Sequence, residues 1–189
     1  LEVAKRAHDP YFVGISSSVV NSMADDFYTQ TKSAQEKLFY ESDIPHLILR
    51  PTLMFGWFDR KHLGWLRRFM DRVPVFPVPG DGKYVRQPLY VGDFVSAIAS
   101  AIEKKQTGTF DISGLEKITY IGLKQTIHHV VEPRARIINI PYGVFWLLLW
   151  FYAIFDRNPP FTTKQLEALV LPETFPVTDW PGVFDVEAT

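Results

Sequence analysis

The sequence contains no cysteine, which excludes disulfide bonds, thiolate catalysis and cysteine-based zinc sites. It also lacks a marked excess of charge, because 20 lysines and arginines face 21 aspartates and glutamates for a net charge of −1. No run of basic residues is long enough to follow a phosphate backbone, so we expect no nucleic-acid partner. The redox compartment stays open, and a cytoplasmic location is the simplest expectation.

The segment 1–10 lacks the features of a targeting segment. It has neither a basic start nor an apolar signal core, and it begins at Leu1 without a methionine. We therefore expect the chain to begin within a longer protein, of which it is the C-terminal portion.

Apolar residues, by contrast, are abundant. They make up 47% of the 189 residues, enough for one core and a smaller lobe. The longest apolar run, residues 140–155, falls short of the ~20 residues needed to cross a bilayer. Because its apolar residues surround the helix axis, we expect it to be buried within a lobe. A homodimer contact and shallow insertion into a membrane surface are the alternatives.

Short apolar runs alternate with helix-forming segments along the chain. Apolar runs bounded by turn residues predict strands at residues 11–15, 46–49, 85–90, 110–113 and 137–140. Helices are expected at residues 27–41, 63–72, 94–104 and 121–131. This alternation favours a layered α/β fold with a largely parallel sheet. The proline-rich segment 73–82 predicts an irregular connection with short edge strands.

Tyr28 and Lys32 are the first candidates for chemistry. They lie four residues apart in a predicted helix, so they share one face about one turn apart. Asp25 and Asp26 stand just before, where acidic groups favour a helix N-terminus. A free tyrosine titrates near pH ~10, and a neighbouring positive charge favours its ionised form. Such pairs are common on solvated helix faces, so the meaning of this one depends on its context.

A tyrosine that accepts protons near neutral pH needs more than one lysine. Lowering its pKa by ~3 units requires roughly 4 kcal/mol of differential stabilisation, which exceeds what one exposed lysine supplies. A second cation must therefore contribute, and oxidised nicotinamide is such a cation.

Polar residues follow the predicted strands on either side of this helix. The serine run 16–18 follows the strand at 11–15, and Arg50-Pro51 ends the next strand. In open α/β sheets the site lies at the carboxyl ends of the strands, so these segments and the helix are expected around one site. The serines could instead only solvate a loop, without a role in the site. Arg50 is expected to form a structural ion pair.

Four runs resemble one enzyme family: ISSS, YTQTK, LILRPTLMFG and PGDGKYVRQPLYVGDFVSAI. They are similar to the second half of extended short-chain dehydrogenases/reductases of the NAD-dependent epimerase/dehydratase type, and the resemblance covers residues 13–114 well. It implies a partial Rossmann-like, doubly wound parallel sheet with a smaller C-terminal substrate lobe. Residues 1–114 would be the C-terminal part of a dinucleotide-binding domain, with a substrate-lobe insertion at about 57–84. Residues 115–189 would be mostly substrate-binding lobe.

The resemblance also implies residue roles. Tyr28 would be the general acid/base, Lys32 would hold the nicotinamide ribose, and Ser18 would hydrogen-bond the reacting oxygen. The implied binding residues for NAD or NADP are Ser16, Tyr28, Lys32, Pro51, Thr52 and Leu53. Tyr28 would remove a hydroxyl proton as hydride leaves for the nicotinamide, or deliver it in the reverse direction, without a metal.

Among the departures of the sequence from the family, two bear directly on the cofactor and the substrate. It lacks the Gly-rich phosphate loop and the residue after it that separates NAD from NADP, so we expect this chain alone to bind no dinucleotide and to be inactive. Gln87 stands where many sugar-nucleotide enzymes have an arginine, with Arg86 beside it, and both are expected to contact substrate. The QPLYV version resembles atypical members, including the nucleotide-binding accessory subunit of respiratory complex I.

Two functions therefore compete. The first is an NAD(P)-dependent oxidoreductase or epimerase acting on a hydroxyl or keto group, with a sugar nucleotide or a lipid-linked intermediate as candidate substrate. The second is a non-catalytic subunit that binds NAD(P)H for structural reasons. A membrane-peripheral protein is a third reading, drawn from the apolar run.

Two further motifs favour structural roles. Asp93 is expected to cap the helix at 94–104. His128-His129 with Glu132 predicts no metal site, because adjacent histidines on a helix point in different directions.

Overall fold

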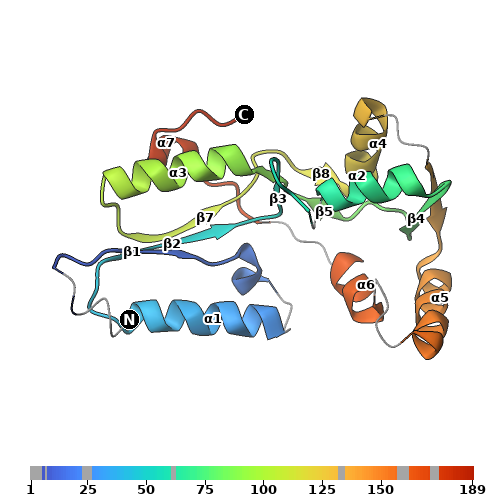
Figure 1. Ribbon diagram of the computed structural model, residues 1–189, viewed down its shortest axis with the longest axis horizontal. Helices are drawn as coiled ribbons and strands as arrows, with labels where there is room; N and C mark the ends of the chain where they lie inside the picture. Colours follow the sequence, from blue (N-terminus) through green and yellow to red (C-terminus); the bar gives the residue numbers. More distant parts are fainter. Residues whose placement is uncertain are drawn as a thin grey trace. The chain divides into compact units, whose positions relative to one another are not determined.

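The computed structural model describes residues 6, 8–22, 27–60, 63–131, 135–156, 162–170 and 175–189 (Figure 1). The chain forms two compact units. The first comprises residues 1–57, 87–116 and 175–189, and the second comprises residues 58–86 and 117–174.

A parallel sheet forms the centre of the first unit. Its three strands are β1 (Phe12–Ile15), β2 (His46–Pro51) and β7 (Gly108–Ile112), in the order β1-β2-β7. Leu47, Ile48 and Leu49 of the central strand are fully buried, which explains why this strand is a continuous apolar run.

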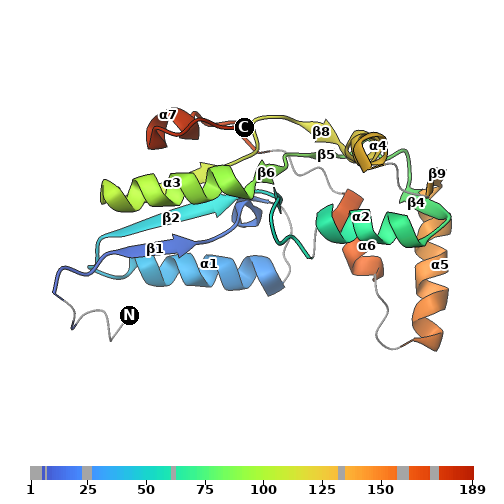
Figure 2. The ribbon, with the colours of Figure 1, turned by 45° about the horizontal axis from the view of Figure 1, so that its top comes forward.

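Helices cover both faces of this sheet. Figures 1 and 2 show α1 (Phe27–Tyr40) on one face and α3 (Val91–Glu103) on the other. On the α1 side the helix approaches β1 closely, because a Cβ at Gly14 would lie 2.7 Å from the Phe39 ring. On the other side, Phe94, Ala97 and Ala101 of α3 are buried in one core with Leu47 and Leu49. Helices on both faces of a parallel sheet confirm the predicted α/β class.

The end of the chain belongs to the first unit. Residues 180–184 form α7 (Trp180–Phe184), and both terminal residues of that helix are buried. Trp180 Nε1 donates to the Ser113 carbonyl at 2.8 Å, and the Phe184 ring meets Phe110 edge-on with centroids 5.2 Å apart. These two large aromatic side chains bury the last segment in the core of the first unit. That residues 115–189 are mostly substrate-binding lobe stays a prediction.

The strand expected at residues 85–90 is two short strands. β5 (Val85–Arg86) pairs antiparallel with β8 (Ile118–Thr119) in the second unit. β6 (Leu89–Tyr90) pairs parallel with β3 (Met54–Phe55) in the first unit. Pro88, which has no N–H to donate, lies between them, so the ladder is interrupted there.

The second unit is built on two parallel strands. β4 (Val75–Pro79) pairs with β9 (Arg136–Ile140), although two of the five residues of β4 are prolines. Proline is tolerated because β4 has one strand partner among the described residues, so its other edge needs no donors. Side chains from α2 (Leu63–Arg72) and α4 (Tyr120–Val131) pack with these strands in a core that includes Leu66, Met70, Phe76, Val78 and Tyr120.

Two further helices complete this unit, α5 (Tyr142–Phe155) and α6 (Thr163–Val170). α5 contains no buried residue, and Phe155 is 76% exposed. The prediction that this apolar segment is buried is therefore wrong, because only Phe145, Trp146 and Leu149, which share one face, are even half-buried. Within the described ranges, no helix is both long and apolar enough to cross a bilayer.

Candidate active site

Tyr28 and Lys32 lie in the first two turns of α1, as predicted. Lys32 Nζ is 5.9 Å from the centroid of the Tyr28 ring. The Tyr28 side chain is 52% exposed, so its hydroxyl can meet a ligand from outside the unit. Asp25 and Asp26 lie outside the described residues.

The Lys32 ammonium joins the start of α1 to the end of β1. Its Nζ donates to the Ile15 carbonyl at 2.9 Å and to Gln35 Oε1 at 3.2 Å. Ile15 is the last residue of β1, so a fixed positive charge lies at the carboxyl end of the sheet, where open α/β folds bind their ligands.

The serine run continues from this same strand end. The Ser16 amide donates to the Leu49 carbonyl at 2.8 Å, which continues the pairing of β1 with β2. Ser17 caps the short 3-10 helix η2 (Ser18–Asn21) by accepting from the Val19 amide at 3.5 Å. Ser16 and Ser18 are each only 4% exposed. These two hydroxyls are therefore packed groups, and solvation of a loop is not their role.

The segment after β2 is held rigidly. Thr52 Oγ1 donates to the Gln87 carbonyl at 2.7 Å and accepts from the Gly114 amide at 3.1 Å. Gly114 permits this approach, because a Cβ there would lie 2.1 Å from the Pro88 carbonyl oxygen. The next residue, Leu53, accepts the Leu89 amide at 2.8 Å. Together these bonds fix Pro51–Leu53 at the carboxyl end of the central strand.

Arg50 forms the structural ion pair expected of it. Its Nε and Nη2 atoms donate to the two carboxylate oxygens of Glu36 at 2.8 and 2.6 Å, in a bidentate arrangement. Burial alone would raise the pKa of Glu36, but the hydrogen bonds and charge of Arg50 outweigh it and lower that pKa. Asp111 adds a second carboxylate 3.7 Å from Arg50 Nη1.

Glu36 was missed at the sequence level. A signal was available, since Tyr28, Lys32, Glu36 and Tyr40 follow one another at intervals of four residues and therefore form one stripe along α1. A half-buried arginine at the end of β2 requires an acidic partner, and Glu36 is the carboxylate on that stripe.

Arg86 and Gln87 both bond to the backbone. Arg86 is 5% exposed, and its guanidinium donates to the carbonyls of Val85 and Leu169 within the second unit. Gln87 is 2% exposed in the first unit, where its Oε1 accepts the Phe175 amide at 2.6 Å. Their assignment to substrate stays a prediction.

Asp93 does not cap its helix. α3 begins at Val91, three residues earlier than expected, so Asp93 lies inside the first turn. Its carboxylate accepts the backbone amide of Thr189 at 3.0 Å and the Thr189 hydroxyl at 2.8 Å. The capping prediction is wrong, because this carboxylate instead holds the last residue of the chain.

Glu132, the third member of the histidine motif, lies outside the described residues. Within the described part of the chain, no group of three or more histidine, aspartate or glutamate side chains could hold a metal ion.

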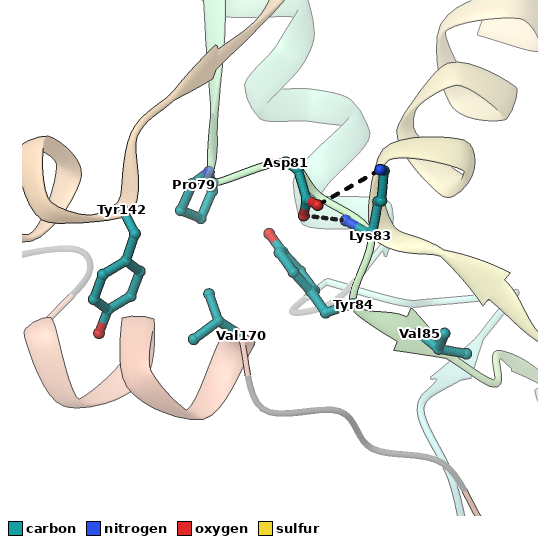
Figure 3. A pocket seen from close by; sticks show the side chains of 8 residues that line it. Pro79, Asp81, Lys83, Tyr84, Val85, Tyr142 and Val170 are labelled. Atoms are coloured by element: carbon teal, nitrogen blue, oxygen red, sulfur yellow. Dashed lines mark hydrogen bonds and ion pairs between the residues drawn. The ribbon is translucent and has the colours of Figure 1, made fainter.

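The second unit contains a pocket of about 530 Å³, which the sequence did not indicate. It is lined by residues of the segment 79–85, by Tyr142 of α5 and by Val170 of α6 (Figure 3). Figure 3 shows the Tyr84 ring pointing into it between Pro79 and Val170, with the Asp81–Lys83 ion pair at its side. The Tyr84 hydroxyl has no hydrogen-bond partner among the described residues, and burial raises the pKa of Tyr84.

A buried lysine lies in the core of the same unit. Lys124 is fully buried, and its Nζ lies 3.4 Å from the centroid of the Tyr120 ring and 3.9 Å from that of Phe76. No hydrogen-bond acceptor among the described residues meets this Nζ. Burial lowers the pKa of Lys124 to about 6, so near neutral pH it is largely an uncharged amine.

Known proteins resemble both the sequence and the fold. Ceramide reductase of Caulobacter vibrioides is 26% identical over 140 residues, which is 73% of this chain and 44% of that protein. NADH dehydrogenase (ubiquinone) 1 alpha subcomplex subunit 9, mitochondrial, of Rattus norvegicus is 26% identical across 98% of this chain and 49% of its own length. The chain therefore spans about half the length of these relatives or less.

A solved structure shares the fold. UDP-glucuronic acid 4-epimerase from Bacillus cereus, in complex with NAD, superposes with a TM-score of 0.61 at 21% identity, covering 74% of this chain and 53% of the epimerase. This likeness confirms the partial Rossmann-like fold that the sequence predicted.

A family model also matches the sequence directly, over a range that includes parts of both units. The model of the NAD dependent epimerase/dehydratase family matches residues 24–113, which include α1, β2 and α3. The cofactor named in the family's description is NAD, as the sequence resemblance led us to expect. Residues 24–113 are thus similar to the NAD dependent epimerase/dehydratase family, the family that the sequence resemblance indicated.

Proposed function

We propose that the protein is an NAD(P)-dependent oxidoreductase or epimerase that acts on a hydroxyl or keto group. The observation that carries this proposal is the position of Lys32, whose ammonium is bound to the last carbonyl of β1 with the exposed Tyr28 ring 5.9 Å away. A phenol beside a fixed positive charge, at the carboxyl end of a parallel sheet, has the chemistry of a general acid/base.

Each residue has a distinct task in this proposal. The Tyr28 hydroxyl takes the proton from a substrate hydroxyl during oxidation and returns it during reduction. The Lys32 ammonium donates to a ribose hydroxyl of the dinucleotide. Ser18 donates to the substrate oxygen. When bound, the nicotinamide supplies the hydride acceptor or donor.

The segment around Pro51 fits a dinucleotide. Thr52 and Leu53 are locked by backbone bonds, so Pro51–Leu53 offers a fixed apolar wall for a flat ring. The buried Ser16 lies beside this wall, because its amide bonds to Leu49 in the same strand as Pro51. These residues would hold the nicotinamide half of NAD or NADP.

The relatives offer two substrate classes. The Bacillus cereus structure is that of a UDP-glucuronic acid epimerase, which favours a sugar nucleotide, and the Caulobacter relative is a ceramide reductase, which favours a lipid carrying a hydroxyl or keto group. Both substrates present the group that a Ser18, Tyr28 and Lys32 site requires.

Binding of the cofactor tests this proposal at Lys32. In the full-length protein, Lys32→Ala should weaken NAD(H) or NADP(H) binding roughly 10-fold to 100-fold in titration calorimetry, since a charge-assisted hydrogen bond contributes about 1.5–3 kcal/mol. Lys37→Ala is the matched control, because Lys37 lies on the same helix and forms only an exposed pair with Glu41. Equal affinity in both variants would remove Lys32 from the cofactor site.

A second function is favoured by one comparison. The rat relative, similar across 98% of this chain, is a subunit of an NADH dehydrogenase complex. A non-catalytic subunit of that kind would bind NAD(P)H tightly and would not turn over any hydroxyl or keto substrate. Tight binding without turnover would therefore select this function over the first.

A further inference from the structure

The surface of α5 in the second unit is apolar and exposed, and the proposed function does not explain it. The helix has no charged side chain along its 14 residues. Its exposed large apolar side chains are between 37% and 76% accessible: Tyr142, Val144, Leu147, Leu148, Trp150, Phe151, Tyr152, Ile154 and Phe155. Contiguous exposed apolar surface of this kind marks an interaction site.

The exposed side chains cover a wide arc of the helix. At about 100° per residue, the exposed positions from Trp150 round to Tyr152 span roughly 200° of the circumference. The remaining face holds the half-buried Phe145, Trp146 and Leu149, together with Tyr142, which lines the pocket. A partner helix or a groove covers a stripe of about 100°, so a single protein partner would leave half of this arc in water. Acyl chains can cover all of it.

The two edges of the arc carry amphipathic aromatic residues. Trp150 lies at one edge and Tyr152 at the other, and the Tyr152 hydroxyl donates to Asp156 at 3.1 Å. Tryptophan and tyrosine are enriched at the headgroup level of membranes, where one end of the side chain is apolar and the other is wet. The centre of the arc, around Leu148, Phe151 and Phe155, is purely hydrocarbon.

We propose that α5 lies in the surface of a lipid bilayer, with its exposed arc buried in one leaflet and Trp150 and Tyr152 at the headgroups. The helix is about 21 Å long, shorter than the ~30 Å of a hydrocarbon core, which suits a helix in the plane of the interface. Because the arc carries no basic residue, apolar burial drives the binding, and anionic lipid is not required. This inference does not depend on the proposed chemistry.

Vesicle flotation with the full-length protein tests the proposal. We expect the protein to float with pure phosphatidylcholine vesicles, and equally well at low salt and in 1 M salt, since apolar binding is not screened. Leu148→Ser, Phe151→Ser and Phe155→Ser together should reduce the bound fraction at least 10-fold. Val130→Ser with Phe58→Ser is the matched control, because these apolar side chains are 74% and 94% exposed elsewhere in the same unit.

Three results would overturn the proposal: no flotation of the wild type, flotation that requires anionic lipid and is lost in 1 M salt, or a stable dimer in solution that the triple variant dissociates. The last would assign α5 to a second copy of the chain.

Quenching of tryptophan fluorescence by brominated phosphatidylcholine provides a measurement that needs no folded triple variant. Wild type should be quenched, and Trp150→Phe should lose part of that quenching; no quenching in wild type would contradict insertion.

Discussion

At the scale of single residues, fixed positions matter more than unusual residue types. Tyr28, Lys32 and Ser18 are common residues, and the role proposed for them depends on where the fold places them. The Lys32 ammonium on α1 donates a hydrogen bond to the Ile15 carbonyl at the end of β1, so this contact joins a helix to a strand. Spacing in the sequence predicted the pair on one helix face, and the folded chain adds the hydrogen bond of Lys32 to the strand end.

The ion pair between Arg50 and Glu36 should contribute measurably to stability. Glu36→Gln leaves a largely buried guanidinium without its main partner, and Asp111 compensates only in part, so we expect a loss of roughly 2–3 kcal/mol in the free energy of unfolding at pH 7. Urea denaturation measures this loss. Glu41→Gln, which breaks an exposed pair with Lys37, should change it by less than about 0.5 kcal/mol.

The pH dependence of this pair has a definite sign. The pKa of Glu36 is lower in the folded protein than in the unfolded chain. The stabilisation from its carboxylate is therefore fully present above the pKa of the unfolded chain, and it is lost as the pH falls through the pKa of the folded protein. Wild-type stability should therefore fall faster than that of Glu36→Gln below about pH 4.5. Parallel decline of both proteins would mean that the carboxylate contributes nothing.

The buried amine of Lys124 should weaken the second unit. The pKa of Lys124 in the folded protein is about 6, below its ordinary value of 10.5. Between these two pH values the unfolded chain binds more protons than the folded protein. The stability of the wild type therefore rises with pH from about 6 to about 10.5. Lys124→Met keeps a side chain of similar volume and removes the cost of burying an amine that is protonated in the unfolded chain. We therefore expect it to raise the free energy of unfolding at pH 7 by roughly 2–4 kcal/mol. The gain should shrink towards pH 10.

Urea denaturation at pH 6, 7.5 and 9.5 measures this effect, with Lys117→Met, an exposed position, as the control. A destabilising Lys124→Met with no pH dependence would show instead that the two aromatic rings hold a charged ammonium.

At the scale of elements, the sequence predicted most of the fold correctly. The bounds of α2 match residues 63–72, and the three strands of the main sheet were found from their apolar runs. The errors have physical causes. The N-cap of α3 is Tyr90, whose side chain makes no capping hydrogen bond. The preference of aspartate for N-cap positions therefore placed the start of this helix wrongly at Asp93. The exposure of α5 depends on what packs against it, which no local pattern records.

The terminal helix α7 should be essential to the first unit. Trp180→Ala removes a side chain that is 2% exposed and the hydrogen bond to Ser113, so we expect a loss of roughly 3–5 kcal/mol in the free energy of unfolding. Val183→Ala, on the same helix but 44% exposed, should cost far less in the same urea denaturation. Equal effects would mean that α7 is not part of the core.

At the scale of the whole molecule, contacts between distant segments were beyond prediction. β4 and β9 pair across about sixty residues, and Asp93 binds Thr189 across 96 positions. Neither contact leaves a local pattern, whereas the helix pair Tyr28 and Lys32 does. The site could therefore be proposed from the sequence, and Glu36 could have been added from its stripe on α1, but the supporting residues Asp111 and Gly114 could not be.

The most direct test of the central claim is hydride transfer itself. Full-length protein, supplied with NAD(P)H and a panel of keto sugar nucleotides and keto lipids, should change the nicotinamide absorbance with at least one substrate. Tyr28→Phe should lower that rate roughly 100-fold to 10,000-fold while dinucleotide affinity stays unchanged, because only the proton transfer is lost. Tyr40→Phe, equally exposed on the same helix, should retain the rate. A Tyr28→Phe variant with wild-type turnover, or tight cofactor binding without turnover of any substrate, would contradict the account.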